Sequence, residues 1–209
     1  MGVNALILES NLVTRECLRR VIEDSFSGEA SVEEVATGPE ALARVRAAAS
    51  GGRPVDLLLV DMEHPDGDWP GLLRACSADV LVRVVCTLNA DDDQLFKAMA
   101  AGADGHLRKD ARFELLVEHL QRIARGMPPL TPGLARRMVA ALSAGQAGAA
   151  RVLSERESAV LTALGRGLTV REVARQQGVR WPTLYSPLRS ACRKLAMAEV
   201  SEGAAQASG

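Results

Sequence analysis

Polar side chains stand at the ends of four apolar runs in the sequence. Glu9 directly follows the first run, Asp61 and Thr87 follow two others, and Lys109 stands just beyond a fourth. A carboxylate flanked by a second acid, a hydroxyl and a lysine can accept a phosphoryl group. The acids would hold Mg²⁺ through oxygen, and the metal and the ammonium would offset the incoming charge. The alternative is a solvated set of strand-end residues, which four matching positions disfavour.

These four residues can meet only if the apolar runs are neighbouring strands of one sheet. The strand candidates cover residues 3–8, 31–36, 55–60, 81–86 and 105–107. Helical patterns lie between and after them, at residues 13–24, 39–49, 69–75, 92–101 and 113–125. Five strand–helix units in this order predict an α/β domain over residues 1–126, with a doubly wound parallel sheet. A ligand site of such a sheet lies at the carboxyl ends of its strands.

The next stretch, residues 127–150, has the composition of a linker with one short helix. Two prolines at 128 and 129 end the preceding helix. Pro132 then opens an amphipathic segment, and residues 143–150 are rich in Ala, Gly and Gln. This stretch therefore separates the α/β domain from whatever follows it.

A small all-helical domain is predicted over residues 151–198. The pairs Ser154/Glu157 and Thr169/Glu172 have the spacing of capping boxes, which begin helices. A third helix has one apolar face, formed by Leu184, Leu188, Ala191, Cys192 and Leu195. Three short helices joined by tight turns predict a helix-turn-helix module. Residues 199–209 are interpreted as a flexible tail.

Composition sets the class of protein. The chain has 209 residues, of which 47% are hydrophobic, 24% charged and 3% aromatic. These are ordinary globular values, and about 150 residues per domain allows one large domain or two small ones. No apolar run approaches the roughly 20 residues of a membrane span, and we see no secretory signal. Four scattered cysteines without a CxxC pair favour a reducing, cytoplasmic setting.

The charge is divided unevenly along the chain. Residues 1–126 carry 14 Lys and Arg against 21 Asp and Glu, whereas residues 151–209 carry 9 against 5. An acidic domain joined to a basic one indicates different partners, and the basic one could meet phosphates. The alternative is ordinary scatter in charge.

The order of these motifs resembles a bacterial two-component response regulator of the NarL/FixJ type, with a receiver domain and a LuxR-type helix-turn-helix. The resemblance spans about residues 3–197. Its receiver part rests on the segments "ALILESNLVTRECLRR", "VDLLLVDMEHPDGD" and "VVCTLNADDDQLFKAMAAGADGHLRKDA". Its effector part rests on "LSERESAVLTALGRGLTVREVARQQGV" and "TLYSPLRSACRKL".

The resemblance implies a role for each residue at the strand ends. Asp61 would accept the phosphoryl group from a sensor histidine kinase. Thr87 and Lys109 would bind the phosphate, and His106 stands at the family's aromatic switch position, three residues before the lysine. Phosphorylation would then shift an equilibrium between conformers, favouring homodimers and releasing the DNA-binding domain.

Two positions of the receiver depart from the family pattern. Ser10 replaces an acid that normally contacts Mg²⁺, and a hydroxyl is a weaker ligand for a hard cation. The metal set would then be Glu9, Asp61 and, if its side chain turns inward, Glu63; the alternative for Glu63 is a solvent-facing loop residue. A histidine at 106 could make the switch sensitive to pH, or be a partly exposed loop residue.

The effector departs too, because its third helix contains Pro187 and the tail lacks apolar periodicity. Pro187 could bend or delay that helix. The residues expected to face double-stranded DNA, by contacts to bases or phosphates, are Arg180, Thr183, Tyr185, Ser186, Arg189, Arg193 and Lys194. For each arginine the alternative is a solvated helix face.

Three classes of function follow. The first is a DNA-binding transcriptional regulator, switched either by phosphorylation of Asp61 or by an atypical, phosphate-independent signal. The second is a protein-interaction module with impaired DNA binding. The third, an aspartate-nucleophile phosphatase with Glu63 as its second acid, lacks a substrate cap, so we expect no enzyme.

Overall fold

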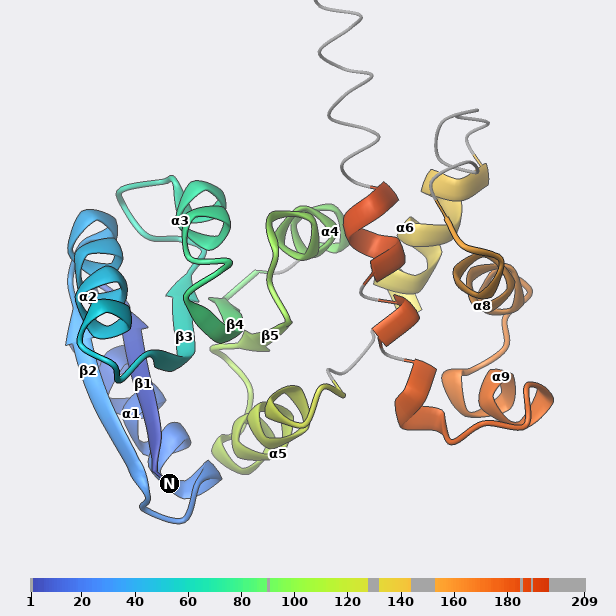
Figure 1. The fold of residues 1–209 in the computed structure, drawn as a ribbon. Helices are drawn as coiled ribbons and strands as arrows, with labels where there is room; N and C mark the ends of the chain where they lie inside the picture. The colour runs from blue at the N-terminus through green and yellow to red at the C-terminus, as the bar shows by residue number, and fades with distance from the viewer. Residues whose placement is uncertain are drawn as a thin grey trace, which may run out of the picture. The chain divides into compact units, whose positions relative to one another are not determined.

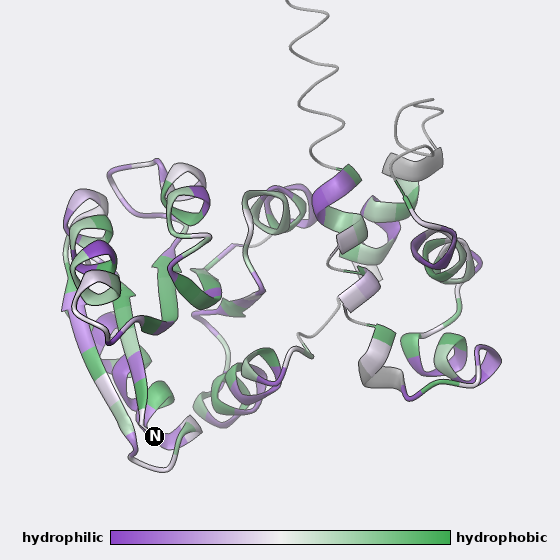
Figure 2. Cartoon of the chain, in the orientation of Figure 1, coloured by the Kyte–Doolittle hydropathy of each residue, from purple (hydrophilic) through white to green (hydrophobic). Residues whose placement is uncertain are grey.

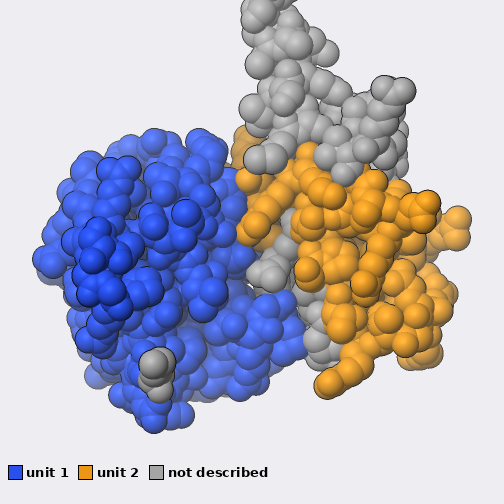
Figure 3. All heavy atoms as spheres, viewed as in Figure 1, with its two compact units in different colours: residues 1–90, 101–129 blue, residues 91–100, 130–209 orange. Residues whose placement is uncertain are grey.

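The computed structural model describes residues 2–89, 91–127, 132–143, 153–184, 186–188 and 190–195. The chain divides into two compact units, coloured separately in Figure 3. The first unit comprises residues 1–90 and 101–129, and the second comprises residues 91–100 and 130–209.

The first unit is built on a five-stranded parallel sheet with the order β2-β1-β3-β4-β5. The strands are β1 (Val3–Leu8), β2 (Ala30–Val35), β3 (Val55–Asp61), β4 (Val80–Thr87) and β5 (Gly105–Arg108). The predicted α/β fold is therefore confirmed, and each strand edge lies within one residue of its predicted place. Figure 2 shows hydrophobic residues along the central strands, as expected when helices cover both faces of a parallel sheet.

The register of the sheet determines which residues reach its carboxyl edge together. Leu8 pairs with Val60, so Glu9 lies beside Asp61. Asp61 pairs with Cys86, which brings Thr87 to the same edge. Thr87 in turn pairs with Arg108, the residue before Lys109. Because parallel strands end at one edge, three adjacent pairings bring the four polar residues together.

Four helices belong to the first unit: α1 (Leu12–Ser25), α2 (Gly38–Ser50), α3 (Trp69–Ala75) and α5 (Phe113–Ala124). Asn11, Thr37 and Asp68 cap the first three through side-chain oxygens. Figure 1 shows α1 and α5 beside the sheet, and their buried residues share one apolar core with β1, β3, β4 and β5. A Cβ at Gly105 would lie 2.6 Å from the Ile123 side chain, so a glycine on β5 lets α5 pack closely.

The second unit is helical throughout its described residues. It contains α4 (Asp92–Ala101), α6 (Pro132–Ser143), α8 (Glu155–Gly165), α9 (Val170–Gln176) and the 3₁₀ helix η1 (Trp181–Leu184). Both capping boxes are formed, at Ser154/Glu157 and at Thr169/Glu172. Helix α6 packs against α8 and buries Leu134 and Met138. No helix in the described ranges has both the length and the apolarity needed to cross a membrane.

The helix that contains Pro187 follows η1 in the chain. Residues 181–184 form η1, and α-helical backbone is described at 186–188 and 190–195. Pro187 thus follows Ser186, the first α-helical residue described after η1. All five residues of the predicted apolar face are buried: Leu184, Leu188, Ala191, Cys192 and Leu195.

Candidate functional site

The four strand-end residues form one buried polar cluster at the carboxyl edge of the sheet. Glu9, Asp61 and Thr87 are 1%, 4% and 0% exposed. The Lys109 ammonium lies 2.5 Å from Asp61 Oδ1 and 2.8 Å from Glu9 Oε2. The lysine therefore compensates two carboxylates that burial would otherwise leave without a counter-charge.

The start of α1 holds Glu9 in place. Glu9 Oε1 accepts a hydrogen bond of 2.8 Å from the Asn11 backbone N–H. Arg15, one turn into α1, donates from Nε to the Glu9 carbonyl at 2.9 Å. Ser10, between these contacts, is exposed.

Glu63 contacts the other members of the cluster from the loop after β3. Its Oε1 accepts hydrogen bonds from the Thr87 hydroxyl and, at 3.0 Å, from the Leu88 backbone N–H. Its Oε2 lies 3.3 Å from Lys109 Nζ, and its own N–H donates to Asp61 Oδ1 at 2.9 Å. Glu63 therefore turns inward, although its side chain remains 39% exposed.

Burial and neighbouring charges set the protonation of these groups. Burial raises the pKa of Asp61 to about 6, against the opposing hydrogen bond from Lys109. For Glu63 burial acts in the same direction, but hydrogen bonds from Thr87 and from Leu88 outweigh it and lower its pKa. Burial would lower the pKa of Lys109, yet its contacts with Asp61 and Glu9 hold that pKa above its usual value. The lysine is therefore a permanent cation.

The arrangement does not present an open magnesium site. Among the described residues, no three His, Cys, Asp or Glu side chains form a group that could hold a metal ion. The three carboxylates expected as ligands, of Glu9, Asp61 and Glu63, all contact the Lys109 ammonium. Lys109 contacts one oxygen of each carboxylate, so a divalent cation at this site would have to bind beside the ammonium through the other oxygens.

A family model covers the part of the chain that carries this cluster. The model of the response regulator receiver domain matches residues 5–121, more than half of the chain. The chain belongs to the response regulator family. The resemblance inferred from the sequence motifs is thereby confirmed. Receiver domains typically bind Mg²⁺ at an acidic site.

Relatives extend the match beyond the receiver domain of this response regulator. A nitrate/nitrite response regulator protein homolog from Haemophilus influenzae is 26% identical, over 92% of this chain and 90% of the relative. The DNA-binding transcriptional activator DevR/DosR of Mycobacterium tuberculosis is 28% identical, over 90% and 88%. The solved RcsB response regulator of Salmonella typhimurium shares the fold, with a TM-score of 0.51 and 19% identity over 93% and 92%.

His106 lies on β5 of this response regulator, at the position of the expected switch residue. Burial lowers its pKa to about 4, and the charges of His119 and Arg108 act in the same direction. At neutral pH the ring is therefore uncharged. A pH-sensitive switch at this position, which the sequence left open, would need acidic conditions.

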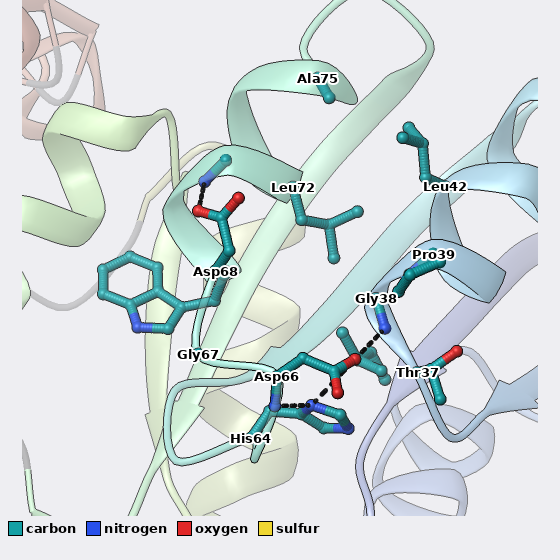
Figure 4. Close-up of a pocket in the computed structure, with 13 residues that line it drawn as sticks. Thr37, Gly38, Pro39, Leu42, His64, Asp66, Gly67, Asp68, Leu72 and Ala75 are labelled. Atoms are coloured by element: carbon teal, nitrogen blue, oxygen red, sulfur yellow. Dashed lines mark hydrogen bonds and ion pairs between the residues drawn. The ribbon is translucent and has the colours of Figure 1, made fainter.

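A second polar group, which the sequence did not single out, anchors the loop after β3. His64 is 6% exposed, with Nε2 2.9 Å from the Ala36 carbonyl oxygen and Nδ1 accepting from the Asp66 N–H at 3.2 Å. The Asp66 carboxylate accepts from the Gly38 N–H at 2.7 Å. Figure 4 shows both side chains at one end of a pocket of about 710 Å³ whose other walls include Leu42 and Leu72. The loop that carries Glu63 is thus tied to the start of α2.

The residues expected to face DNA divide into three groups. Arg180, Thr183 and Ser186 are exposed, and the Thr183 hydroxyl donates to the Arg180 carbonyl at 2.7 Å. Arg193 is half-buried, and Lys194 Nζ lies 2.8 Å from Glu157 Oε2. Tyr185 and Arg189 lie outside the described residues. The Lys194 charge is therefore already engaged within the helical unit.

Proposed function

We propose that this response regulator controls transcription by binding double-stranded DNA, and that phosphorylation of Asp61 in its receiver domain sets that binding. The observation that carries the proposal is the joint presence of two features. One is the buried cluster of Asp61, Thr87 and Lys109. The other is a match along about nine-tenths of the chain to a relative named as a DNA-binding transcriptional activator.

The chemistry at Asp61 would be a simple displacement. A carboxylate oxygen attacks phosphorus, so that an O–P bond forms while the P–N bond to a phosphohistidine of the sensor kinase breaks. The electron pair of that bond stays with the histidine nitrogen. The Thr87 hydroxyl would donate to a phosphoryl oxygen, and the Lys109 ammonium would offset its charge.

The DNA contacts would come from Arg180, from η1 and from the helix that follows it. We propose the exposed residues Arg180, Thr183 and Ser186, together with Tyr185 and Arg189. Arg193 and Lys194 were expected to meet phosphates as well. The ion pair of Lys194 with Glu157 favours a structural role for Lys194 instead.

The remaining parts of the proposal concern organisation. Residues 1–126 would be the receiver domain, 127–150 the linker and 151–198 the DNA-binding domain, with a tail at 199–209. The partners would be a sensor histidine kinase and a second copy of this chain, since such modules read paired half-sites. Mg²⁺ remains a proposal, with Glu9 and Asp61 as ligands, because the Glu63 carboxylate, the third ligand expected from the sequence, is engaged by Thr87, Leu88 and Lys109. Regulators among the named relatives support a regulatory rather than an enzymatic role.

The test is incubation of the purified full chain with Mg²⁺ and acetyl phosphate, followed by intact mass measurement. We expect one added phosphoryl group in the parent and none in Asp61→Ala. Operator binding should then strengthen in the phosphorylated protein and weaken steeply as salt rises. Weak, salt-insensitive binding to every DNA tested would instead support a protein-interaction module, and steady turnover of an aryl phosphate would support an enzyme.

A second candidate is regulation without phosphorylation. Ser10 stands in place of an acid, and Glu63 already contacts the groups that the phosphate would need. An unchanged mass in the parent, with the fold intact, would favour this candidate.

A further inference from the structure

Three donors converge on the carboxylate of Glu63 from outside its own loop. The Thr87 hydroxyl and the Leu88 N–H lie at the end of β4 and just beyond it, and both donate to Oε1. The Lys109 ammonium follows β5 and lies 3.3 Å from Oε2. A solvated loop glutamate would need none of these contacts. Their source in two strands that are distant in sequence indicates a formed anion site.

Two of these donors, the Thr87 hydroxyl and the Lys109 ammonium, are those that the proposed function assigns to a phosphoryl group on Asp61, and the Leu88 N–H lies directly beside Thr87 in the chain. Such a group would be held beside Asp61 by a hydroxyl, a backbone N–H and a lysine, since all three complement oxyanions. Glu63 stands at this place because its own N–H donates to Asp61 Oδ1 at 2.9 Å. Its side chain therefore begins beside the phosphoacceptor and ends on the phosphate-binding donors.

We propose that the Glu63 carboxylate is a resident substitute for the phosphoryl group, engaging Thr87, Leu88 and Lys109 in the unphosphorylated protein. A phosphoryl group arriving on Asp61 must displace it. The proposal rests on the proposed function and names its regulation. It has two consequences. The three donors are already occupied by a carboxylate in the unphosphorylated receiver domain, and phosphorylation of Asp61 is slowed because the phosphoryl group must compete for the same donors.

The first test reads the contact itself. In ¹H–¹⁵N spectra of the unphosphorylated full chain, the Leu88 amide proton should lie downfield in the parent and move upfield in Glu63→Ala. Glu29→Ala is the matched control, because Glu29 is an exposed glutamate away from the cluster and should leave the Leu88 signal in place. An unmoved Leu88 signal in Glu63→Ala would overturn the proposal.

The second test measures the phosphorylation rate, which reports competition between Glu63 and the phosphoryl group for the same donors. With acetyl phosphate and Mg²⁺, Glu63→Ala should gain its phosphoryl group about tenfold faster than the parent, because a charge-assisted hydrogen bond no longer has to be displaced. Glu63→Gln, which keeps the oxygen and loses the charge, should fall between them. The double variant with Asp61→Ala should gain nothing. Equal rates in the parent and Glu63→Ala would overturn the competition.

The two proposals fail in different ways. A Leu88 shift in Glu63→Ala with no phosphoryl group on any variant would leave the resident contact standing and remove phosphorylation of Asp61. A phosphoryl group on the parent with equal rates and an unmoved Leu88 signal would leave the proposed function standing and remove the role of Glu63. Circular dichroism of each variant reports whether its fold is intact.

Discussion

Lys109 compensates three carboxylates that come from three different parts of the chain. Its ammonium contacts Glu9, Asp61 and Glu63, and its side chain is 7% exposed. A buried ion cluster costs desolvation, yet the removal of one partner leaves uncompensated charge. The stability of the receiver domain therefore depends on the same residue that the proposed phosphorylation would use.

Lys109→Met should lower the free energy of unfolding by about 3 kcal/mol at pH 7.5. The loss should shrink as the pH falls to 5.5. A carboxyl group whose pKa is raised in the folded state contributes stability below its unfolded pKa, and this contribution is lost as the pH rises through its folded pKa. The pKa of Asp61 is already about 6 in the parent. Urea unfolding at both pH values checks this, with Lys97→Met, at an exposed lysine, as control. Equal midpoints for the two variants would contradict the prediction.

His106 predicts a second dependence on pH, of opposite sign. Its pKa is about 4 when folded, against an ordinary value of 6.5 for histidine, so the unfolded chain binds the proton more readily. The stability that this neutral ring contributes is full above pH 6.5 and is lost as the pH falls through 4, by about 3 kcal/mol in total. Urea unfolding of the parent and of His106→Phe across this range isolates the effect. The variant should lose less stability than the parent, and parallel curves would refute the assignment.

One capping residue of the helical unit, Glu157, also contacts a second helix. Glu157 completes the capping box of α8 by accepting from the Ser154 N–H at 2.7 Å, and it also accepts from Lys194 at 2.8 Å. Burial would raise its pKa, but the contacts with Lys194, Ser190 and Ser154 lower it to about 2. The Glu157 carboxylate thus joins the start of α8 to the helix that contains Lys194.

Lys194→Met should therefore destabilise the helical unit by about 1–3 kcal/mol, the usual value of a hydrogen bond to a charged group. The salt dependence of its DNA binding should stay unchanged. Arg180→Ala, at an exposed position, should leave stability unchanged and lower the salt slope by about one. Thermal unfolding and binding titrations at several salt concentrations separate the two. A reversed outcome would make Lys194 the phosphate contact.

At the scale of the whole molecule, α4 packs with the helical unit although it lies between β4 and β5 in the chain. Arg137 of α6 donates to Asp93 at 2.5 Å, and its guanidinium carbon lies 4.6 Å from the ring centre of Phe96. A Cβ at Gly133 would lie 2.0 Å from the Asp92 carboxylate, so a larger residue there would require this exposed side chain to move. Helix α6 is therefore a packed part of the helical unit, because it contacts both α4 and α8.

Arg137→Ala should loosen α4. Asp93 is 66% exposed, so its ion pair contributes little, and the cation–π contact adds about 0.5–1 kcal/mol. Amide exchange in Asp92–Ala101 should accelerate by about two- to fivefold. Hydrogen–deuterium exchange measures this, with Arg136→Ala on the same helix as control. An α4 that exchanges equally in both variants would show that the contact contributes nothing.

Much of this protein follows from local patterns in its sequence. Alternating apolar runs and helical stretches predicted the sheet, and Glu9, Asp61, Thr87 and Lys109 were found because each stands next to a strand end. The capping boxes could be predicted because the two residues of each box are three positions apart in the sequence. In each case the information lies within a few residues, and strand pairing then brings separate ends together.

Only the tertiary structure decided where the long side chains of the loops and helix faces point. The direction of Glu63 depends on Thr87 and Lys109, donors 24 and 46 positions away in the chain. Lys194 meets Glu157, and Arg137 meets Asp93, across comparable separations. A flexible charged side chain has no periodicity that reveals its partner. Its position follows from the free energy of pairing charges that the fold brings into contact.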